Sequence, residues 1–259
     1  MLLVIDIGNT NLSIGCLQEE KICFEARIAT DRSRTSDQYG VEIKNMLEAY
    51  GVKLSDIDDC IISSVVPPVL NAVRTGVMRI IGRQPMVVKP GLKTGLNICV
   101  DNPNLVGSDL VVGAVGALSI ADAPLIVIDM GTATTLTVLG EGNKFLGGVI
   151  IPGLHLSMEA LSGGTSLLPR VSLDAPEKCI GTNTVECMQS GAIFGSAAML
   201  DGMIERLEAE LGQKTTVIAT GGLAGCVTPF CKREIRYEPD LLFTGLAVLW
   251  EKNRRDRRS

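Results

Sequence analysis

Val4–Asn11 has the sequence VIDIGNTN, in which an apolar run that opens at residue 2 ends in an aspartate, a glycine and small polar residues. The run is typical of a buried strand, and the small residues predict a tight turn into a second strand. Glycine lets the backbone approach a bound group closely because it has no Cβ atom. Backbone N–H groups and Asn or Thr side chains there could donate to phosphate oxygens, and Asp6 could hold a hydrated divalent cation. The stretch therefore predicts a clamp for nucleotide phosphates.

The same pattern returns as VIDMGTAT at Val127–Thr134, so that Asp129 lies 123 residues after Asp6. The same offset separates Lys21 from Lys144, each of which opens a later strand-like run. One Asp-x-Gly sequence is more often an ordinary hairpin turn. Two copies at one offset, each ending an apolar strand, predict a duplicated domain. Two such turns facing one cleft would hold the phosphates of a nucleotide from both sides.

The composition is that of a globular protein with a substantial core. The chain has 259 residues, of which 46% are hydrophobic and 20% charged. This length suffices for one large domain or two of ordinary size. Aromatic residues make up only 3%, so Val, Ile, Leu and Ala must fill the core. The net charge of −5 gives no reason to expect nucleic acid or an anionic membrane surface as a partner.

Neither the N-terminus nor the cysteines point to export or to a membrane. No stretch reaches 18 uninterrupted apolar residues, so no membrane span is predicted. The N-terminal run leads straight into Asp6 and is interpreted as a strand rather than a signal peptide. The eight cysteines form no C-x-x-C pair, and most lie within apolar runs. We expect buried, reduced thiols in a cytoplasmic protein.

Apolar periodicity predicts the order β-β-β-α-β-α-β for the first half of the chain. The all-apolar stretch at residues 110–118 predicts a buried helix that joins the halves. The pair Ala123-Pro124 marks the boundary between predicted domains at residues 1–122 and 123–259. The predicted strands of the first half lie at residues 2–5, 12–17, 21–28, 60–65 and 86–88, and its helices at 36–50 and 69–81.

The second half is predicted to hold a long helix at residues 184–211, a strand at 216–220 and a final helix at 241–253. Four charged residues of the long helix are expected on its solvent face: Glu205, Arg206, Glu208 and Glu210.

Three further motifs admit both a structural and a functional interpretation. Gly107-Ser108-Asp109 precedes the buried helix and, from these residues alone, is more typical of an N-cap than of a general base aimed into a cleft. Gly147–Gly153 and Thr220–Ala224 are glycine-rich and either pack against a ligand or form plain turns. His155 is the only histidine, so hydrolytic triads and His-ligated metals are poorly supported.

Taken together, these motifs resemble those of type III pantothenate kinases, in the acetate and sugar kinase/Hsp70/actin superfamily. The resemblance covers essentially the whole chain, in order. It implies an α/β fold of two duplicated ribonuclease-H-like (actin-like ATPase) domains around a nucleotide cleft. The matching motifs are Asp6–Asn11, Gly107–Asp109, Asp129–Thr135, Gly147–Gly153 and Gly181–Thr184.

The resemblance also implies a role for each site residue. Asp109 would be the catalytic base that takes the proton from the pantothenate hydroxyl, which reverses the preference for a simple cap. Asp6 would help to hold magnesium, and Asp129 would bind a monovalent cation, potassium or ammonium. The family is dimeric, with its site near the subunit interface, so Thr184 would act in the partner's site. ATP would contact Asp6, Ile7, Gly8, Asn9, Thr10, Asn11, Leu12, Ser13 and Thr132, and pantothenate would contact Val100, Gly107, Ser108, Asp109, Leu110 and Thr184.

Two positions depart from the family's pattern. The family usually has Arg where this chain has Leu110, and Tyr where it has Val100, and both positions belong to its pantothenate pocket. An absent Arg removes a bidentate partner for the substrate carboxylate. Nucleotide binding is therefore better supported than the identity of the substrate.

The resemblance implies ATP-dependent phosphorylation of pantothenate to 4′-phosphopantothenate, the first step of coenzyme A biosynthesis. Two alternatives stay open. One is a non-catalytic relative such as the Bvg accessory factor, which acts in transcriptional regulation. The other is a kinase of another small hydroxy acid or sugar. Retention of Asp6, Asp109 and Asp129 favours catalysis.

Overall fold

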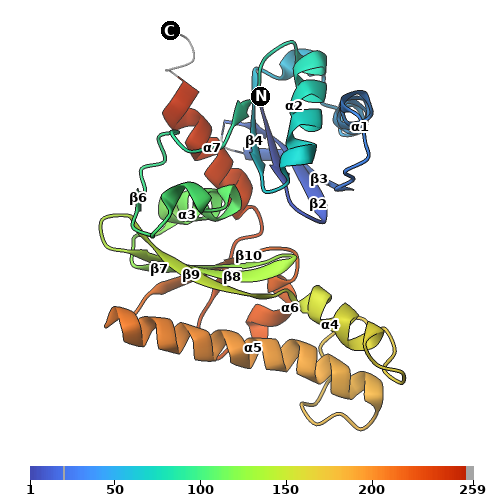
Figure 1. Ribbon diagram of the computed structural model, residues 1–259, viewed down its shortest axis with the longest axis vertical. Coiled ribbons are helices and arrows are strands. Elements are labelled where there is room, and N and C mark those ends of the chain that lie inside the picture. The colour runs from blue at the N-terminus through green and yellow to red at the C-terminus, as the bar shows by residue number, and fades with distance from the viewer. Residues whose placement is uncertain (20, 255–259) are drawn as a thin grey trace. The chain divides into compact units, whose positions relative to one another are not determined.

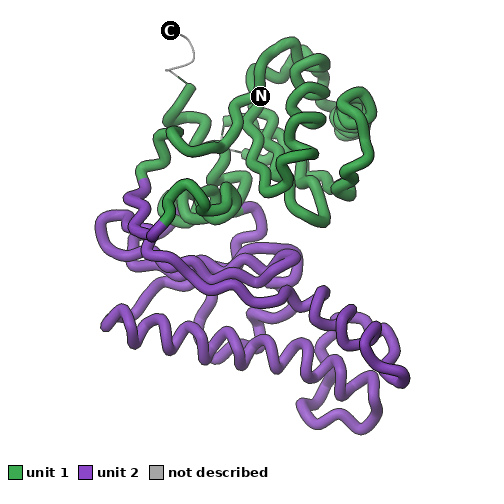
Figure 2. The backbone as a smooth tube through the Cα atoms, viewed as in Figure 1, with its two compact units in different colours: residues 1–95, 102–119, 241–259 green, residues 96–101, 120–240 purple. Residues whose placement is uncertain are grey.

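The computed structural model describes residues 1–19 and 21–254, and these form two compact units (Figure 2). Unit 1 contains residues 1–95, 102–119 and the segment that begins at Leu241. Unit 2 contains residues 96–101 and 120–240.

The chain passes from unit 1 into unit 2 after Ser119, whereas the predicted domains divide after residue 122. The units and the predicted domains differ over residues 96–101 and the final helix. That helix lies in unit 1, where Trp250 Nε1 donates to Asp59 Oδ2 at 2.9 Å. Asn253 also donates to the backbone carbonyl of Lys93 at 3.0 Å.

Unit 1 is built on a five-stranded sheet with the strand order β3-β2-β1-β4-β5 (Figure 1). The first strand pairs antiparallel with β2 and parallel with β4, so Asp6 lies beside Ser13 on one side and Ser63 on the other. The strands are β1 (Leu2–Ile7), β2 (Asn11–Gln18), β3 (Lys21–Ala29), β4 (Asp59–Ser64) and β5 (Met86–Val87), and the helices are α1 (Ser36–Ala49), α2 (Pro67–Ile81), α3 (Ser108–Ile120) and α7 (Leu241–Asn253).

The two faces of this sheet are covered by different helices. Leu3, Ile5 and Ile7 belong to a core cluster that also contains buried residues of α1 and α2. Val4 points to the opposite face, where Phe243 of α7 also lies, because a Cβ atom added to Gly15 would lie 3.0 Å from Phe243 and 3.2 Å from Val4. Since side chains alternate along a strand, Asp6 shares the face of Val4 and is turned away from α1 and α2.

The predicted helices of unit 1 form, with small shifts at their ends. Thr35 and Gln38 make a reciprocal capping box at the start of α1, as expected from the sequence. The second helix begins at Pro67, two residues before its predicted start, because proline fits the first turn of a helix.

Unit 2 repeats this arrangement around a six-stranded sheet with the order β11-β10-β7-β8-β9-β6. In Figure 1 the long helix α5 runs along one face of the sheet, and its residues share a core cluster with Ile126, Ile128 and Met130. The strands are β6 (Asn97–Ile98), β7 (Leu125–Met130), β8 (Ala133–Gly140), β9 (Lys144–Pro152), β10 (Thr216–Thr220) and β11 (Arg236–Tyr237), and the helices are α4 (Leu154–Gly163), α5 (Thr184–Leu211) and α6 (Ala224–Val227).

The two sheets confirm the duplication. Strands β1-β2-β3 and β7-β8-β9 form the same antiparallel meander, and each meander breaks register once between its second and third strands. The turns differ by one residue. Gly8 N donates to Asn11 O at 3.0 Å, whereas Gly131 N donates to Ala133 O at 3.1 Å. The fold is therefore a mixed α/β fold with two related sheets.

The strands β6 and β11 and the helix α4 were not predicted from the sequence, and the predicted exposure of several side chains was wrong. Strand β6 is only two residues long, which is too short for a periodic signal. Glu208, expected on the solvent face of α5, is only 4% exposed. All eight cysteines are free thiols in the described part of the chain, but only two of them are buried. The exposed ones lie on edge strands, loops or helix surfaces: Cys23, Cys99, Cys179, Cys187 and Cys226.

No helix in residues 1–19 and 21–254 combines the length and apolar character needed to cross a membrane.

Candidate functional site

The first candidate element is the turn between β1 and β2. Asn9, Thr10 and Asn11 are exposed, while Gly8 is half-buried. Thr30, just after β3, braces this turn: its Oγ1 donates to Gly8 O at 2.7 Å and its N donates to Thr10 O at 2.9 Å. The turn is thus held from within unit 1 and presents its polar side chains outward.

The alternation of side chains along the strands determines which of the other predicted residues of this stretch are buried. Ile7 and Leu12 are buried in the core, so only their backbone atoms are positioned to contact a ligand. Asp6 and Ser13 are half-buried and lie side by side in the register of β1 and β2.

The second candidate element is the start of α3, which reaches the same edge of the sheet. Ser108 Oγ donates to Ser64 O at 2.9 Å and accepts from Ser64 N at 3.2 Å. Ser63 Oγ donates to Ser108 Oγ at 3.1 Å. Because Ser63 is the register partner of Asp6 on β4, these contacts bring the Gly107–Leu110 motif to the carboxyl end of the strand that neighbours Asp6.

Asp109 is the acidic residue of this second element. Its Oδ1 accepts a hydrogen bond from Leu110 N at 2.8 Å. Burial raises the pKa of the Asp109 carboxyl above its usual value, although the backbone N–H groups of Leu110 and Asp109 oppose the shift. A Cβ atom on Gly107 would lie 2.4 Å from Asp109 Oδ1, so the glycine makes room for the carboxylate. A half-buried carboxyl with a raised pKa at the edge of a sheet is suited to accept a proton.

The third candidate element is the turn between β7 and β8 in unit 2. Asp129 ends β7, and its register partner on the parallel strand β10 is Thr220. Thr132 is exposed, and its carbonyl accepts a hydrogen bond from Gly153 N at 3.2 Å. Gly221 follows Thr220 with φ +93° and approaches so closely that an added Cβ would lie 2.5 Å from Asp129 Oδ1. The two parallel strands therefore enclose the Asp129 carboxylate.

The remaining predicted residues lie elsewhere in unit 2. Val100 follows β6 and is half-buried, with a side-chain carbon 3.9 Å from the Cβ position of Gly147. Thr184 is the exposed first residue of α5, where Asn183 caps the helix. Unit 1 therefore brings together the residues of the 6–13 and 107–110 motifs, whereas Asp129, Thr132, Val100 and Thr184 belong to unit 2.

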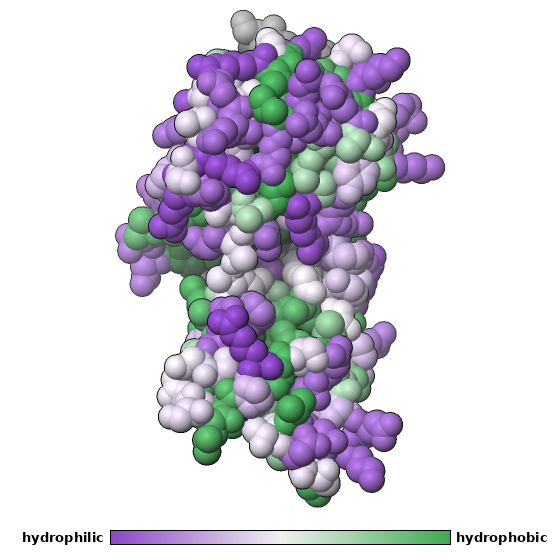
Figure 3. Space-filling model, turned by 90° about the vertical axis from the view of Figure 1, so that its right-hand side faces the viewer, coloured by the Kyte–Doolittle hydropathy of each residue, from purple (hydrophilic) through white to green (hydrophobic). Residues whose placement is uncertain are grey.

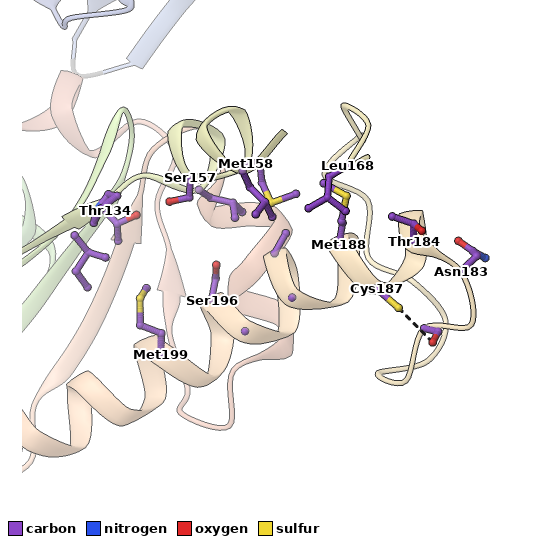
Figure 4. Close-up of a pocket in the computed structure, with 18 of the residues that line it drawn as sticks. Thr134, Ser157, Met158, Leu168, Asn183, Thr184, Cys187, Met188, Ser196 and Met199 are labelled. Atoms are coloured by element: carbon purple, nitrogen blue, oxygen red, sulfur yellow. Dashed lines mark hydrogen bonds between the residues drawn. The ribbon is translucent and has the colours of Figure 1, made fainter. Parts of the chain in front are cut away.

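Thr184 stands at the end of a pocket of about 920 Å³ between α4 and α5 (Figure 4). The lining is mostly apolar and includes Met158, Met188 and Met199. The hydrogen bond from Cys187 Sγ to Gly181 O, 3.4 Å long, closes the loop that carries the Gly181–Thr184 motif.

The residues at these turns fit phosphate groups with a hydrated cation. Among residues 1–19 and 21–254 there is no group of three or more His, Cys, Asp or Glu side chains that could hold a metal ion. Mg²⁺ that is bound with phosphates usually needs only one or two carboxylates and keeps several waters. A single aspartate beside an exposed polar turn, as at Asp6, meets that requirement.

Two features of the site were not predicted from the sequence. Ser63 and Ser64 tie the start of α3 to the sheet, and Thr30 braces the first turn. The signal available for the serines was a pair of hydroxyl residues at the end of an apolar strand. Nothing in the sequence indicated that Thr30 would contact Gly8, because that contact depends on the pairing of β2 with β3.

The chain matches a family model described as type III pantothenate kinase over residues 2–206. It is 42% identical over 254 residues to "Type III pantothenate kinase" from Exiguobacterium sibiricum, and that match covers 98% of this chain and 100% of the relative.

Solved structures share the fold at low sequence identity. A conserved putative Baf family transcriptional activator from Campylobacter jejuni gives a TM-score of 0.60 at 19% identity, covering 98% of this chain and 99% of that one. A putative N-acetylglucosamine kinase from Porphyromonas gingivalis gives a TM-score of 0.52 at 13% identity, covering 98% and 100%. These likenesses show that the chain shares the two-sheet α/β fold of these proteins.

Proposed function

The chain belongs to the type III pantothenate kinase family, and from that premise we propose that it transfers the γ-phosphoryl group of ATP to the hydroxyl of pantothenate. The product would be 4′-phosphopantothenate, in the first step of coenzyme A biosynthesis. The observation that carries the proposal is the placement of Asp109. Its helix is tied by Ser108 to the strand beside Asp6, so a proton acceptor lies at the same sheet edge as a phosphate turn.

Phosphoryl transfer depends mainly on positioning and charge neutralisation. We assign the turn at residues 8–13 and Thr132 to binding and orienting the phosphates of ATP. Asp6 would hold magnesium, and Asp129 would hold potassium or ammonium. When bound, these cations would neutralise charge on the phosphoryl oxygens. A carboxylate enclosed by Gly221 and Thr220 is a suitable oxygen ligand for such an ion.

Asp109 would act as the general base. Its ionised carboxylate accepts the proton of the substrate hydroxyl, and the hydrogen bond from Leu110 N fixes the Oδ1 atom while the other oxygen takes the proton. The raised pKa strengthens the carboxylate as a proton acceptor.

The pH dependence of kcat/KM should report this group. Asp109 must be ionised to act, so activity is lost as pH falls through its pKa. Because burial raises that pKa, the acid limb of the profile should lie above the value of about 3.9 for an ordinary aspartate. Initial rates between pH 4 and 8, with circular dichroism to verify the fold at each pH, would measure it. An acid limb at the ordinary value in folded protein would contradict the assignment.

Gly221→Ala should disturb the cation site. Alanine is disfavoured at φ +93°, and its Cβ would press on Asp129 Oδ1, so we expect a stability loss of about 1–3 kcal/mol. The potassium concentration for half-maximal activity should also rise. The control is Gly163→Ala, where a Cβ would meet open space. Equal potassium dependence in both variants would argue against a cation at Asp129.

The proposal is tested by ADP release from ATP and magnesium, with and without pantothenate, in potassium and in sodium buffer. Pantothenate-dependent release that requires potassium is the expected result. A panel of other small hydroxy acids and sugars serves as the substrate control, because Leu110 and Val100 offer half-buried apolar side chains. Release with another acceptor but not with pantothenate would reassign the substrate. Release with none, from folded protein that binds ATP, would favour a regulatory role.

We further propose a homodimer, formed through unit 2. Several large apolar side chains of unit 2 are exposed, each at or next in sequence to a residue that lines the pocket between α4 and α5, and Figure 3 shows green, hydrophobic atoms at the surface of this unit. Exposed apolar surface of this kind is typical of an interaction surface. It would place Thr184 near the partner's site. The exposed residues are Ile150, Leu156, Leu161, Leu167, Ile180 and Val185.

Leu161→Glu should break this dimer. Leu161 lines the pocket and is 41% exposed, so a buried charge there would oppose association. Val41→Glu is the control, because Val41 is 57% exposed on α1 in unit 1. Sedimentation should give twice the 27.5 kDa chain mass for the control and a single chain for Leu161→Glu. A dimer that survives Leu161→Glu would place the interface elsewhere.

The eight free thiols accord with a reducing cytoplasm, which we propose as the location. Fractionation of cells would test this location, and recovery of the protein in the fraction of an oxidising compartment would contradict it.

A further inference from the structure

The hydroxyl of Ser63 is completely buried at the carboxyl end of β4. It lies on the face of the sheet that carries Asp6, because the two residues are register partners on parallel strands. Its hydrogen-bond partner is Ser108 Oγ, 3.1 Å away and 45 positions later in the chain.

The hydroxyl of Ser108 has no remaining hydrogen-bonding capacity. A serine hydroxyl has one proton to donate and two lone pairs to accept. The proton goes to Ser64 O at 2.9 Å, and the lone pairs accept from Ser64 N at 3.2 Å and Ser63 Oγ at 3.1 Å. Two consecutive serines on β4 therefore satisfy this side chain completely. The Ser108 side chain links β4 to the start of α3. Only the backbone atoms of Ser108 remain available to contact the substrate.

The hydrogen bonds of Ser108 to β4 hold the first residue of α3, and Asp109 is the second residue of this helix. Within the motif the Asp109 carboxylate accepts from the backbone N–H groups of Leu110 and of Asp109 itself, and both of these groups move with the helix. The place of the carboxylate in unit 1 therefore depends on where the helix begins. Without the Ser63 hydroxyl, Ser108 would keep only its two contacts with the backbone of Ser64.

We propose that Ser63 is a positioning residue, which acts through Ser108 to fix the start of α3 and hence the Asp109 carboxylate beside the strand of Asp6. For its kinetic readout the inference rests on the proposed function.

The kinetic test is Ser63→Ala, with Ser119→Ala as the matched control. Ser119 lies near the other end of α3, and its hydroxyl bonds only within the helix, to Gly116 O at 2.6 Å. Ser63→Ala should lower kcat roughly tenfold, the effect of one lost buried hydrogen bond, with KM for ATP nearly unchanged. Ser119→Ala should leave kcat unchanged. An unchanged kcat in Ser63→Ala, with an active wild type, would overturn the inference.

A double-mutant cycle tests the route through Ser108. If Ser63 acts only through that residue, Ser63→Ala combined with Ser108→Ala should be no slower than Ser108→Ala alone. Losses in kcat that multiply would contradict the proposed route.

Hydrogen exchange gives a readout that needs no activity. The backbone N–H groups at the start of α3 should exchange roughly tenfold faster in Ser63→Ala than in wild type or Ser119→Ala. Unaltered exchange there would overturn the inference even if the wild-type protein phosphorylated nothing. Absence of pantothenate-dependent ADP release in the wild type, with the expected exchange, would contradict the proposed function alone.

Discussion

Asp109→Asn is expected to lower kcat by at least about 100-fold while leaving the fold and ATP binding intact, because a positioned base typically contributes 10²–10⁴-fold. Asparagine keeps the shape of the side chain and can still accept the hydrogen bond from Leu110 N through its amide oxygen. What it lacks is a site of sufficient basicity to take the proton of the substrate hydroxyl. Steady-state rates together with ATP titration would separate lost chemistry from lost binding.

The stability of this variant provides a second check. A carboxyl whose pKa is raised on folding contributes stability only below its unfolded pKa, and that contribution is lost as pH rises through the folded pKa. At neutral pH the ionised Asp109 therefore opposes folding, and Asp109→Asn should not lower the Tm. Asp122→Asn, at an exposed position beyond α3, is the control and should keep full activity. Near-normal turnover in Asp109→Asn would remove the residue from the mechanism.

Glu208→Ala is expected to produce the largest loss of stability, about 2–3 kcal/mol, because it leaves several hydrogen-bond donors without their acceptor. The carboxylate accepts from Lys214 Nζ at 2.7 Å, from Thr215 N at 2.9 Å and from Arg233 Nη2 at 3.0 Å. It thereby joins the end of α5 to β10 and to the segment before β11. Arg233 Nε already lacks a partner and is buried. The ion pair with Lys214 contributes little to this loss, because the Lys214 side chain is 79% exposed and solvent screens its charge.

Glu210→Ala is the matched control, since Glu210 is exposed two positions later on the same helix. Thermal melts of both variants would show a clear fall in Tm for Glu208→Ala alone. Burial acts to raise the pKa of Glu208, but hydrogen bonds from Lys214 and Thr215 and the charge of Arg233 outweigh it and lower the pKa. The stability it supplies is therefore lost as pH falls through the folded pKa. Equal melting of the two variants would show that the network is dispensable.

Local sequence signals predicted the elements whose ends carry caps or glycines. The predicted bounds of the long helix, Thr184–Leu211, and of the last, Leu241–Asn253, match the structure. The first hairpin and its repeat were found because each places an aspartate at the end of an apolar strand. These features depend on residues that are close in sequence, so each can be predicted from a single short segment of the chain.

Features that depend on distant pairing were missed. The contact between Ser63 and Ser108 joins segments 45 residues apart. Glu208 was predicted to face solvent because the helical pattern of α5 does not show its ion pair with Arg233, a residue of a later loop. Likewise the final helix is anchored in unit 1 by Trp250 and Asp59, 191 positions apart.

The two repeats divide the proposed work. Unit 1 holds the turn proposed to bind phosphates together with Asp109, the proposed proton acceptor, whereas the corresponding turn of unit 2 holds Asp129 beside Gly221. The two related sheets thus carry side chains with different proposed roles at corresponding edges, a proton acceptor in unit 1 and a cation ligand in unit 2.

The most direct test of the account is the mass of the product after the protein is incubated with ATP, magnesium, potassium and pantothenate. The account predicts pantothenate carrying one added phosphoryl group, in an amount equal to the ADP formed, and no such product from Asp109→Asn. Unmodified pantothenate, from folded protein that binds ATP under conditions in which a family member is active, would contradict it.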